Sequence, residues 1–346
     1  MEASIERIEP RNASDAELEP VFRLRRELAL EQWPEDGYFD FASFAARERS
    51  LQADAHRVWA LAKVDGRLLG YASVGWRDIP ENRHLVGASV GVHPQARREG
   101  LGRRLLAEAG AITEEQGRTV MISEVSSQVP AGAAFAQAIG AEQALEEHDN
   151  RLALADVDRG LLERWMQSDP AGYSVLVVDG VTPPELLAEA ASVFNVMNDA
   201  PRGSLNLEDD QETAESVQGW EKAVAEAGHV QWTVYARHDE SGRFAGFTRV
   251  SHHPSMPRVV DQWGTAVRPE DRGHGLGRLM KATMLDRILR ELPEARTVRT
   301  TNALVNQWML AINRELGFRP GGTVTHWQIE ARAVRYTSGQ PASLLE

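Results

Sequence analysis

The feature that most constrains this chain is an internal repeat of a glycine-rich segment. The first copy covers residues 90–102 and the second residues 265–277, and both contain the pattern Val-x-Pro-x-x-Arg-x-x-Gly-Leu-Gly. The arginines of the two copies, Arg97 and Arg272, lie 175 positions apart, about half of the 346-residue chain. A repeat of this length indicates two whole domains rather than a solenoid, whose units are much shorter.

The residues around the two glycine-rich segments repeat in the same order. Each segment follows two apolar runs separated by a polar turn, which predicts a β-hairpin. After each segment come apolar residues at helical spacing, then a short strand, then a helix that stops at a glycine. The expected elements of the two halves are the hairpin strands 58–64 and 68–76 against 231–237 and 244–250, the helices that begin at Leu101 and Leu276, the strands 119–125 and 297–301, and the helices that stop at Gly140 and Gly317. We therefore expect an α/β (α+β) fold of two tandem domains, each a mixed, mostly antiparallel sheet flanked by helices.

A short segment between the two halves divides the chain. Residues 156–167 have the pattern of a linking helix, and the turn-forming run at 168–172 ends it. We therefore predict an N-terminal domain over 1–155, a linker over 156–171 and a C-terminal domain over 172–334. Residues 335–346 are expected to form a loose tail.

The composition excludes several kinds of function. The formal net charge of −13 would repel the phosphates of nucleic acids, so we expect no nucleic-acid partner and favour neutral or cationic substrates. The absence of cysteine excludes disulfides, thiolate metal sites and an acyl-cysteine intermediate, and we predict no metal. No apolar run is long enough to cross a membrane and the charged start lacks a signal-peptide pattern, so we expect a cytoplasmic protein without membrane contact.

The glycine-rich segments have the features of an anion-binding loop. Glycines before a helix let backbone N–H groups turn inward, and the helix N-terminus adds a partial positive charge that an arginine can supplement. The spacing differs from the Gly-x-Gly-x-x-Gly of dinucleotide-binding folds, and neither copy ends in the Gly-Lys-Ser/Thr of a P-loop. A lone Gly-x-Gly is often a simple turn, but two copies with the same upstream residues favour a pyrophosphate site.

The repeated pattern resembles the acetyl-coenzyme A (acetyl-CoA) signature of GNAT acetyltransferases. The resemblance extends over both halves, and residues 301–318 strengthen it in the second half, which is similar to tandem GNAT proteins of actinobacteria, a group that includes mycothiol synthase. It implies that acetyl-CoA is the cofactor, that the loop backbone binds its pyrophosphate and that the preceding strand pairs with its pantetheine arm.

The resemblance also implies which residues bind coenzyme A (CoA). In the second half they are Thr265, Ala266, Val267, Arg272, Gly273, His274, Gly275, Leu276, Gly277 and Asn306, and in the first half Val90, Gly91, Val92, Arg97, Arg98, Glu99, Gly100, Leu101 and Gly102. For Asn306 a helix-capping or surface role is the alternative.

Acetyl transfer to an amine needs a base, a donor for the oxyanion and an acid for the thiolate. Many members of the family use a tyrosine as the acid, four residues before a glycine, but here those positions hold Ala136 and Asn313. The strand before the second loop contains Asp261, with His252 and His253 upstream, whereas residues 84–91 of the first half have no carboxylate. We therefore predict Asp261 as the base and a β-bulge amide near Ala266 as the oxyanion donor. A solvent-exposed strand-end aspartate is the alternative for Asp261, and loop residues are the alternative for the two histidines.

This contrast predicts that the second half is catalytic and that the first is chiefly a scaffold. Residues 194–210 mix polar and apolar side chains without helical period, where the resemblance implies the segment that covers the substrate. We predict that Asn198, Arg202 and Glu208 line the acceptor pocket; a loop that packs the halves together is the alternative.

The predicted function is that of an acetyl-CoA-dependent N-acetyltransferase. It would move an acetyl group to the primary amine of a small-molecule or amino-terminal acceptor by direct attack in a ternary complex. The alternatives are transfer of a longer acyl group and a non-catalytic CoA binder or sensor. We expect a monomer with pseudo-dimeric halves or a homodimer.

Overall fold

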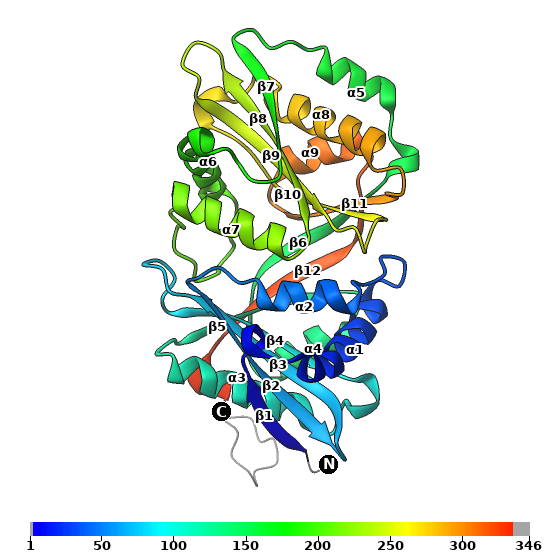
Figure 1. Cartoon of the computed structure of the whole chain (residues 1–346), viewed down its shortest axis with the longest axis vertical. Coiled ribbons are helices and arrows are strands. Elements are labelled where there is room, and N and C mark those ends of the chain that lie inside the picture. Colours follow the sequence, from blue (N-terminus) through cyan, green and yellow to red (C-terminus); the bar gives the residue numbers. More distant parts are fainter. Residues whose placement is uncertain (1–2, 335–346) are drawn as a thin grey trace.

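One sheet of twelve strands runs through residues 3–334, the part of the chain that this computed structural model describes. Its order is β1-β2-β3-β4-β5-β12-β6-β11-β10-β9-β8-β7, so each half of the chain builds one end of the sheet (Figure 1). The strands are β1 Ser4–Ile8, β2 Ala55–Val64, β3 Arg67–Arg77, β4 Leu85–Val92, β5 Val120–Ser126, β6 Glu142–Ala153, β7 Tyr173–Asp179, β8 Val230–His238, β9 Phe244–His252, β10 Val259–Val267, β11 Thr297–Ala303 and β12 Arg319–Glu330. The predicted tail, 335–346, lies outside the described residues.

The middle of the sheet is made by the last strand of each half, and these two strands are exchanged. β12 pairs with β5 of the first half, with Val324 opposite Ser126, whereas β6 pairs with β11 of the second half, with Ala153 opposite Thr297. β6 and β12 also pair with each other and cross the waist of the molecule in Figure 1. Each half therefore completes its sheet with a strand from the other half. The domain boundaries at 155 and 172 were placed from the sequence repeat and stay a prediction.

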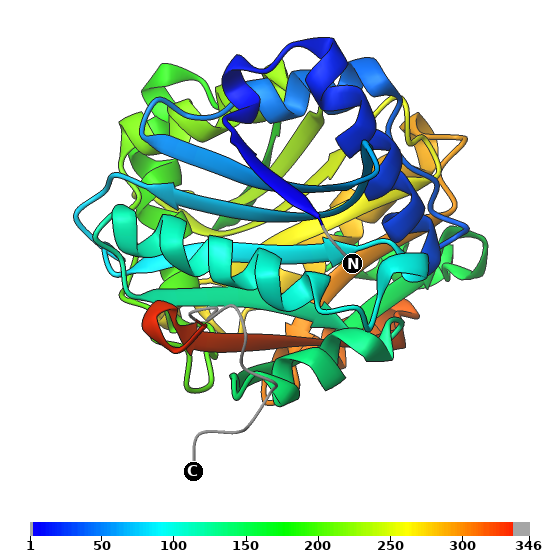
Figure 2. The ribbon, with the colours of Figure 1, turned by 90° about the horizontal axis from the view of Figure 1, so that it is seen from below.

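Helices cover both faces of the sheet. They are α1 Asp15–Gln32, α2 Phe41–Arg49, α3 Leu101–Glu115, α4 Pro130–Ala138, α5 Arg159–Met166, α6 Leu187–Phe194, α7 Ala214–Glu226, α8 Leu276–Glu291 and α9 Gln307–Leu316. In the first half, α1 and α2 lie on one face and α3 on the other, as Figure 2 shows. In the second half α6 and α7 correspond to α1 and α2, and α8 corresponds to α3.

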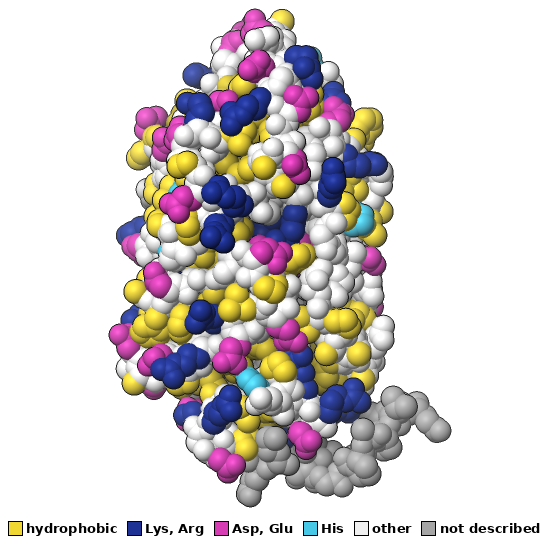
Figure 3. All heavy atoms as spheres, turned by 90° about the vertical axis from the view of Figure 1, so that its right-hand side faces the viewer, with side chains coloured by type: hydrophobic (Ala, Val, Ile, Leu, Met, Phe, Trp, Pro, Cys, Tyr) yellow, Lys and Arg dark blue, Asp and Glu magenta, His cyan; other side chains and the backbone are white. Residues whose placement is uncertain are grey.

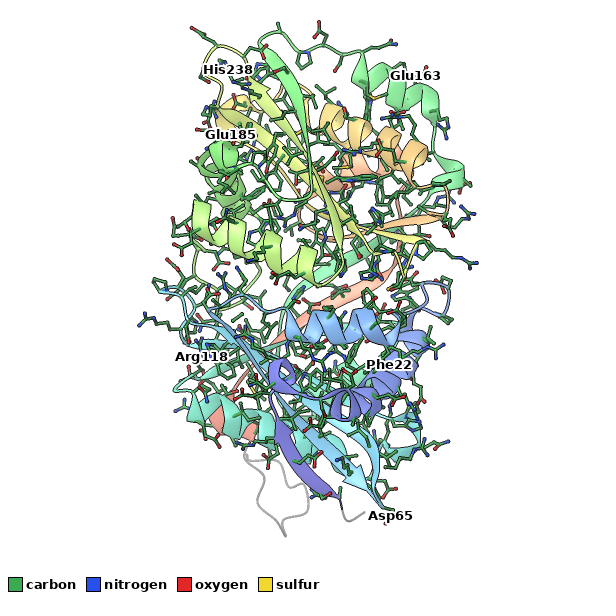
Figure 4. The ribbon with its side chains drawn as sticks, viewed as in Figure 1. Phe22, Asp65, Arg118, Glu163, Glu185 and His238 are labelled. Carbon is green, nitrogen blue, oxygen red and sulfur yellow. The ribbon has the colours of Figure 1, made fainter. Side chains whose placement is uncertain are left out.

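Alternation along the strands explains these two layers. On β2, Trp59 and Leu61 pack beneath α1 and α2, whereas their neighbours Ala60 and Ala62 pack against α3. Phe22 of α1, labelled in Figure 4, lies within 6 Å of the rings of α2 residues and completes the outer layer. The small alanines on the inner face let α3 approach the sheet closely.

The predicted elements are confirmed, with ends that differ by a few residues. The hairpins β2–β3 and β8–β9 are present, and α3 and α8 begin at Leu101 and Leu276 as expected. The mixed, mostly antiparallel sheet is also confirmed. A helix, α5, lies in the segment predicted to link the halves.

The surface carries charge of both signs. On the face drawn in Figure 3, acidic and basic side chains are interspersed with hydrophobic ones. Within residues 3–334 we find no helix of the length and apolar character that crossing a bilayer requires.

Candidate functional site

Each glycine-rich loop enters its helix through a glycine in the left-handed region. Gly100 (φ 80°) is the N-cap of α3 and Gly275 (φ 77°) is the N-cap of α8; Gly273 also has a positive φ, 86°. A Cβ atom on any of these three glycines would meet no heavy atom within 4 Å. Open space therefore lies over the first turns of α3 and α8, whose backbone N–H groups have no partner inside the helix. This geometry suits an anion such as pyrophosphate.

The arginine of each loop supports the loop instead of extending freely toward an anion. In both copies its Nε donates to the carbonyl oxygen of the last residue of the preceding strand, at 3.1 Å. Arg97 also donates through both terminal nitrogens to Glu31, at 2.7 and 2.5 Å, and this contact lowers the pKa of Glu31. Arg272 lies 3.3 Å from Asp199. The backbone, more than these guanidinium groups, is thus available to bind phosphate.

A cavity of about 750 Å³ opens beside the first loop. Strands β4 and β5 are paired in parallel over Leu85–Gly87, and beyond these residues both strands line the cavity. Its walls include the apolar residues Leu106, Met121, Val125, Phe135, Trp327 and Ile329 and seven of the residues predicted to bind CoA, Val90, Gly91, Val92, Arg97, Arg98, Gly100 and Gly102. The prediction of a chiefly structural first half does not anticipate this cavity.

Four other residues assigned to CoA have structural contacts. Leu101 and Leu276 are 2% and 1% exposed and point into the core. The His274 ring lies against Tyr173, and its Nδ1 is 3.1 Å from the carbonyl oxygen of Asp271. Asn306 is the N-cap of α9, so its side-chain oxygen has the capping role that was the alternative.

The strand before the second loop contains an irregularity that the first half lacks at the equivalent point. Between Gln262 and Thr265 the register of β10 against β9 shifts, so Trp263 and Gly264 form a bulge, whereas β4 pairs regularly with β3. The Gln262 amide nitrogen donates to the carbonyl oxygen of Trp263 (3.1 Å) and holds the bulge in place. Ala266, near which the bulge was expected, is itself regularly paired.

Asp261 is part of an ion-pair network between the two halves. Its Oδ1 lies 2.5 Å from Arg299 Nε, and Arg299 also contacts Asp36 of the first half at 2.9 Å. Asp36 is 6% exposed and accepts two hydrogen bonds from Arg151, at 2.7 and 2.9 Å. Asp261 thus has a structural contact with Arg299, and its role as the base stays a prediction.

The other polar residues singled out in the second half are engaged as well. Asn313 is 1% exposed, and its amide nitrogen donates to Asn302 Oδ1 at 2.7 Å. His253 packs edge-on against Phe39, and burial lowers the pKa of its imidazole. Neither side chain borders the two cavities described for residues 3–334.

A second cavity, of about 490 Å³, lies beside the bulge. It contains all three predicted acceptor residues, Asn198, Arg202 and Glu208, together with Gly264 of β10. Across from them it is bordered by Asn82, on a loop of the first half. That loop is held by Arg118, labelled in Figure 4, which donates to the carbonyl oxygens of Arg77, Asn82 and Leu85.

The three predicted acceptor residues mainly shape this cavity. Asn198 donates to the carbonyl oxygen of Asp210 at 2.7 Å, and Arg202 donates back to Asn198 at 2.9 Å. One Glu208 oxygen accepts from the backbone N–H of Asn82 at 2.6 Å. Both readings of residues 194–210 thus have support, since the loop lines a pocket and also joins the halves.

Sequence reasoning missed Arg249, the arginine of this pocket that forms no ion pair within residues 3–334. It lies on β9, its ring contacts are Trp220 at 4.1 Å and Phe194 at 5.3 Å, and burial lowers the pKa of its guanidinium. The signal that could have found it is a charged residue inside the mainly apolar run Phe244–Val250.

Comparisons with known proteins concern both the first half and the whole chain. Residues 18–141 match the family model described as acetyltransferase (GNAT) family. A solved tandem GNAT protein from the clavulanic acid biosynthesis pathway superposes with a TM-score of 0.77 at 26% identity, over 95% of this chain and 99% of that one.

Curated relatives match over shorter stretches. L-amino acid N-acyltransferase MnaT of Escherichia coli (strain K12) is 37% identical over 105 residues, 27% of this chain and 61% of that protein. Mycothiol acetyltransferase of Rhodococcus jostii (strain RHA1) is 29% identical over 225 residues, 62% of this chain and 64% of that protein. The chain thus spans less than two thirds of each of these curated relatives. Together the comparisons support an acyltransferase enzyme.

Proposed function

We propose that this chain is a tandem GNAT acetyltransferase and that it works as an acetyl-CoA-dependent N-acetyltransferase. The acceptor is the primary amine of a small molecule. The observation that carries the proposal is the pair of glycine-rich loops. In each loop a glycine in the left-handed region begins a helix, and the neighbouring parallel strands, β4 with β5 and β10 with β11, pair only over their first three residues.

Acetyl-CoA fits the first loop by shape and by donor chemistry. The first-turn N–H groups of α3 would hold the pyrophosphate, and the edge of β4 at Val90–Val92 would hold the pantetheine arm. The mainly apolar cavity of about 750 Å³ has room for this arm between β4 and β5. In the second half the corresponding groups are the first turn of α8 and Thr265–Val267 of β10. When bound, acetyl-CoA supplies an activated thioester.

We assign the transfer to the second half. The pocket that contains Asn198 and Arg202 reaches β10 at Gly264, within three residues of the strand segment assigned to pantetheine. An acceptor in this pocket would therefore lie next to the thioester. A bulge also turns backbone N–H groups away from the regular pairing of a strand. A backbone N–H group is the kind of donor that stabilises the oxyanion formed in acyl transfer.

The chemistry is a direct attack by the amine. The chain has no cysteine that could carry the acetyl group as a thioester, and in the proposed reaction both substrates are bound together. The C–N bond forms as the C–S bond breaks, the nitrogen loses a proton and the sulfur leaves as a thiolate that takes one up. With Asp261 paired to Arg299, water is the proposed acceptor of the amine proton.

The relatives support amine acylation without defining the acceptor. The E. coli relative is named an L-amino acid N-acyltransferase, and the R. jostii relative a mycothiol acetyltransferase. The first name states acyl transfer to a nitrogen atom, and the second states transfer of an acetyl group.

Two measurements test the proposal. Calorimetry should detect acetyl-CoA binding, with one or two molecules per chain. Thiol release, followed across a panel of primary amines, should show turnover for at least one class, and mass spectrometry should show an amine heavier by one acetyl group. No binding at about 1 mM acetyl-CoA, where even weak specific sites fill, would refute it.

A further inference from the structure

We infer that the pocket beside the β10 bulge binds the carboxylate of the acceptor, with Arg249 as its counter-ion. The acceptor class is then a small molecule that carries both a primary amine and a carboxylate, such as an amino acid. The inference rests on the proposed acetyl transfer and names its substrate class.

In the part of the chain that the structure describes, Arg249 is a cation that forms no ion pair, although the carboxylates of Glu212 and Glu221 act on it at longer range. Among residues 3–334 its side chain has no hydrogen bond or ion pair, and its Nε is buried without a partner. The guanidinium lies against Trp220 (4.1 Å) and Phe194 (5.3 Å), which fixes its plane and leaves its N–H edges for a ligand. A partly buried guanidinium without an anion is unfavourable, so an anionic ligand would stabilise the site.

The other two arginines of the pocket already have anionic partners. Arg77 lies 2.8 Å from Asp54, and Arg202 lies 2.8 Å from Asp209. Arg249 is thus the one pocket arginine, within the described chain, that is free to bind an anion. Guanidinium and carboxylate match in geometry, because two parallel N–H groups can face two oxygens.

The acidic residues of the pocket favour a ligand that is also an amine. Glu208, Asp210 and Glu212 all line it, and their described contacts are to neutral donors, Asn82 for the first two and Ser216 for the third. One unpaired cation among three carboxylates suits a zwitterion with a single carboxylate. A phosphate dianion would meet more repulsion from the same three groups.

The position of Arg249 in the sheet places the ligand near the proposed reaction. Its neighbours on β9 pair with Gln262 and Thr265, so Arg249 faces the bulged residues Trp263 and Gly264. A carboxylate held there is one strand away from the segment assigned to pantetheine. Arg249 would therefore orient the acceptor with its amine toward the thioester.

The first half has no equivalent of this arginine. Leu69 of β3 and Ala245 of β9 are equivalent, because the carbonyl oxygen of each accepts a 2.8 Å backbone bond from the residue that follows β4 or β10. Four positions further on, the first half has Ser73 where the second has Arg249. A purely structural role in the repeated fold would not distinguish the halves in this way, whereas a role in acceptor binding in one half does.

The test compares acceptors that differ only in the carboxylate. Thiol release is measured with free amino acids, their carboxamides and the corresponding decarboxylated amines. We expect free amino acids to be preferred. Arg249→Gln should lower kcat/KM for them by about 10- to 100-fold, the usual loss of a hydrogen bond to a charged group, and should change kcat/KM for carboxamides by less than about 3-fold.

Arg290→Gln is the control, because it removes a cation that pairs with Asp286 at 2.9 Å on α8 and borders neither cavity described for residues 3–334. It should change neither substrate class by more than about 3-fold. Arg249→Lys keeps the charge without the planar fork and should recover part of the activity toward free amino acids. If Arg249→Gln melts at a much lower temperature than the parent, Arg249→Lys takes its place in the comparison of free amino acids with carboxamides.

The outcomes separate the two proposals. Equal use of amino acids and carboxamides, or an equal loss for both in Arg249→Gln, would overturn the carboxylate assignment and leave acetyl transfer intact. Failure to bind acetyl-CoA would instead remove the proposed function. If acetyl-CoA binds but calorimetry detects no free amino acid at about 10 mM on the CoA-saturated protein, the carboxylate assignment also fails.

Discussion

Glutamate in place of Gly275 should abolish coenzyme binding in the second half while the fold persists. Gly275 has φ 77°, a conformation that costs an L residue about 1–2 kcal/mol. A Cβ atom there meets no heavy atom within 4 Å, so no steric clash adds to this cost. A loss of this size lowers the stability of a typical domain without unfolding it.

The charge has the larger effect. A carboxylate at Gly275 would lie at the N-terminus of α8, where we place the pyrophosphate. Two like charges about 4 Å apart repel by about 4 kcal/mol at an effective dielectric constant of 20, which corresponds to about a 1000-fold loss of affinity. Gly275→Ala has the same backbone cost without the charge, so its affinity should stay within about 10-fold of the parent.

Gly100→Glu is the matched control, because Gly100 has φ 80°, is the N-cap of α3 and has the same open space. Both variants should lose similar stability, which urea denaturation measures. Calorimetry with acetyl-CoA and thiol release then report on the two loops separately. We expect Gly275→Glu to lose nearly all turnover and Gly100→Glu to lose little beyond stability. Loss of turnover in Gly100→Glu with turnover spared in Gly275→Glu would show that transfer takes place in the first half.

Three further predictions concern stability. Burial lowers the pKa of Lys281 to about 7, so between about pH 7 and pH 10.5 the unfolded chain binds more protons than the folded one and stability should rise with pH. Lys281→Met should therefore be more stable than the parent near pH 7, and equal urea midpoints of the two proteins would contradict this. The hydrogen bond that the His326 ring donates to Glu147 raises the pKa of His326, so this pair stabilises the fold below about pH 6.5 and less as pH rises through the folded pKa. Glu147→Gln should reduce the change in the free energy of unfolding between pH 6 and pH 8, by under about 1 kcal/mol, as measured by urea denaturation. A chain cut to 1–155 lacks β12 and should fail to fold alone, with a peptide of 319–334 required for cooperative melting; a cooperative transition without the peptide would contradict the importance of the strand exchange.

Much of the local structure of the candidate site follows from the sequence. Glycines just before an apolar periodic run predicted the starts of α3 and α8, because only glycine adopts the left-handed conformation at Gly100 and Gly275 without strain. The repeat itself predicted two similar halves, and the tandem fold confirms this. These features depend on a few adjacent residues, so a short sequence pattern is enough to predict them.

The identity of the polar residues that are free to act could not be predicted in the same way. Asp261 looked like a base because it precedes a loop, but its partner Arg299 in turn binds Asp36, which is 263 positions away in the chain. Arg249 looked like any strand residue, and only the tertiary structure shows that its side chain forms no ion pair within residues 3–334 and that its Nε is buried without a hydrogen-bond partner. Whether a side chain is free depends on neighbours from the whole chain.

The sequence by itself determined the period, the loops, the helix starts and the hairpins, since short-range backbone preferences and apolar spacing decide these. Only the tertiary structure decided the exchange of β6 and β12, since many antiparallel pairings satisfy the same alternating pattern. It also decided that the pocket of residues 194–210 is closed by Asn82 of the other half. Long-range pairing sets both, and through them which side chains face the proposed acceptor.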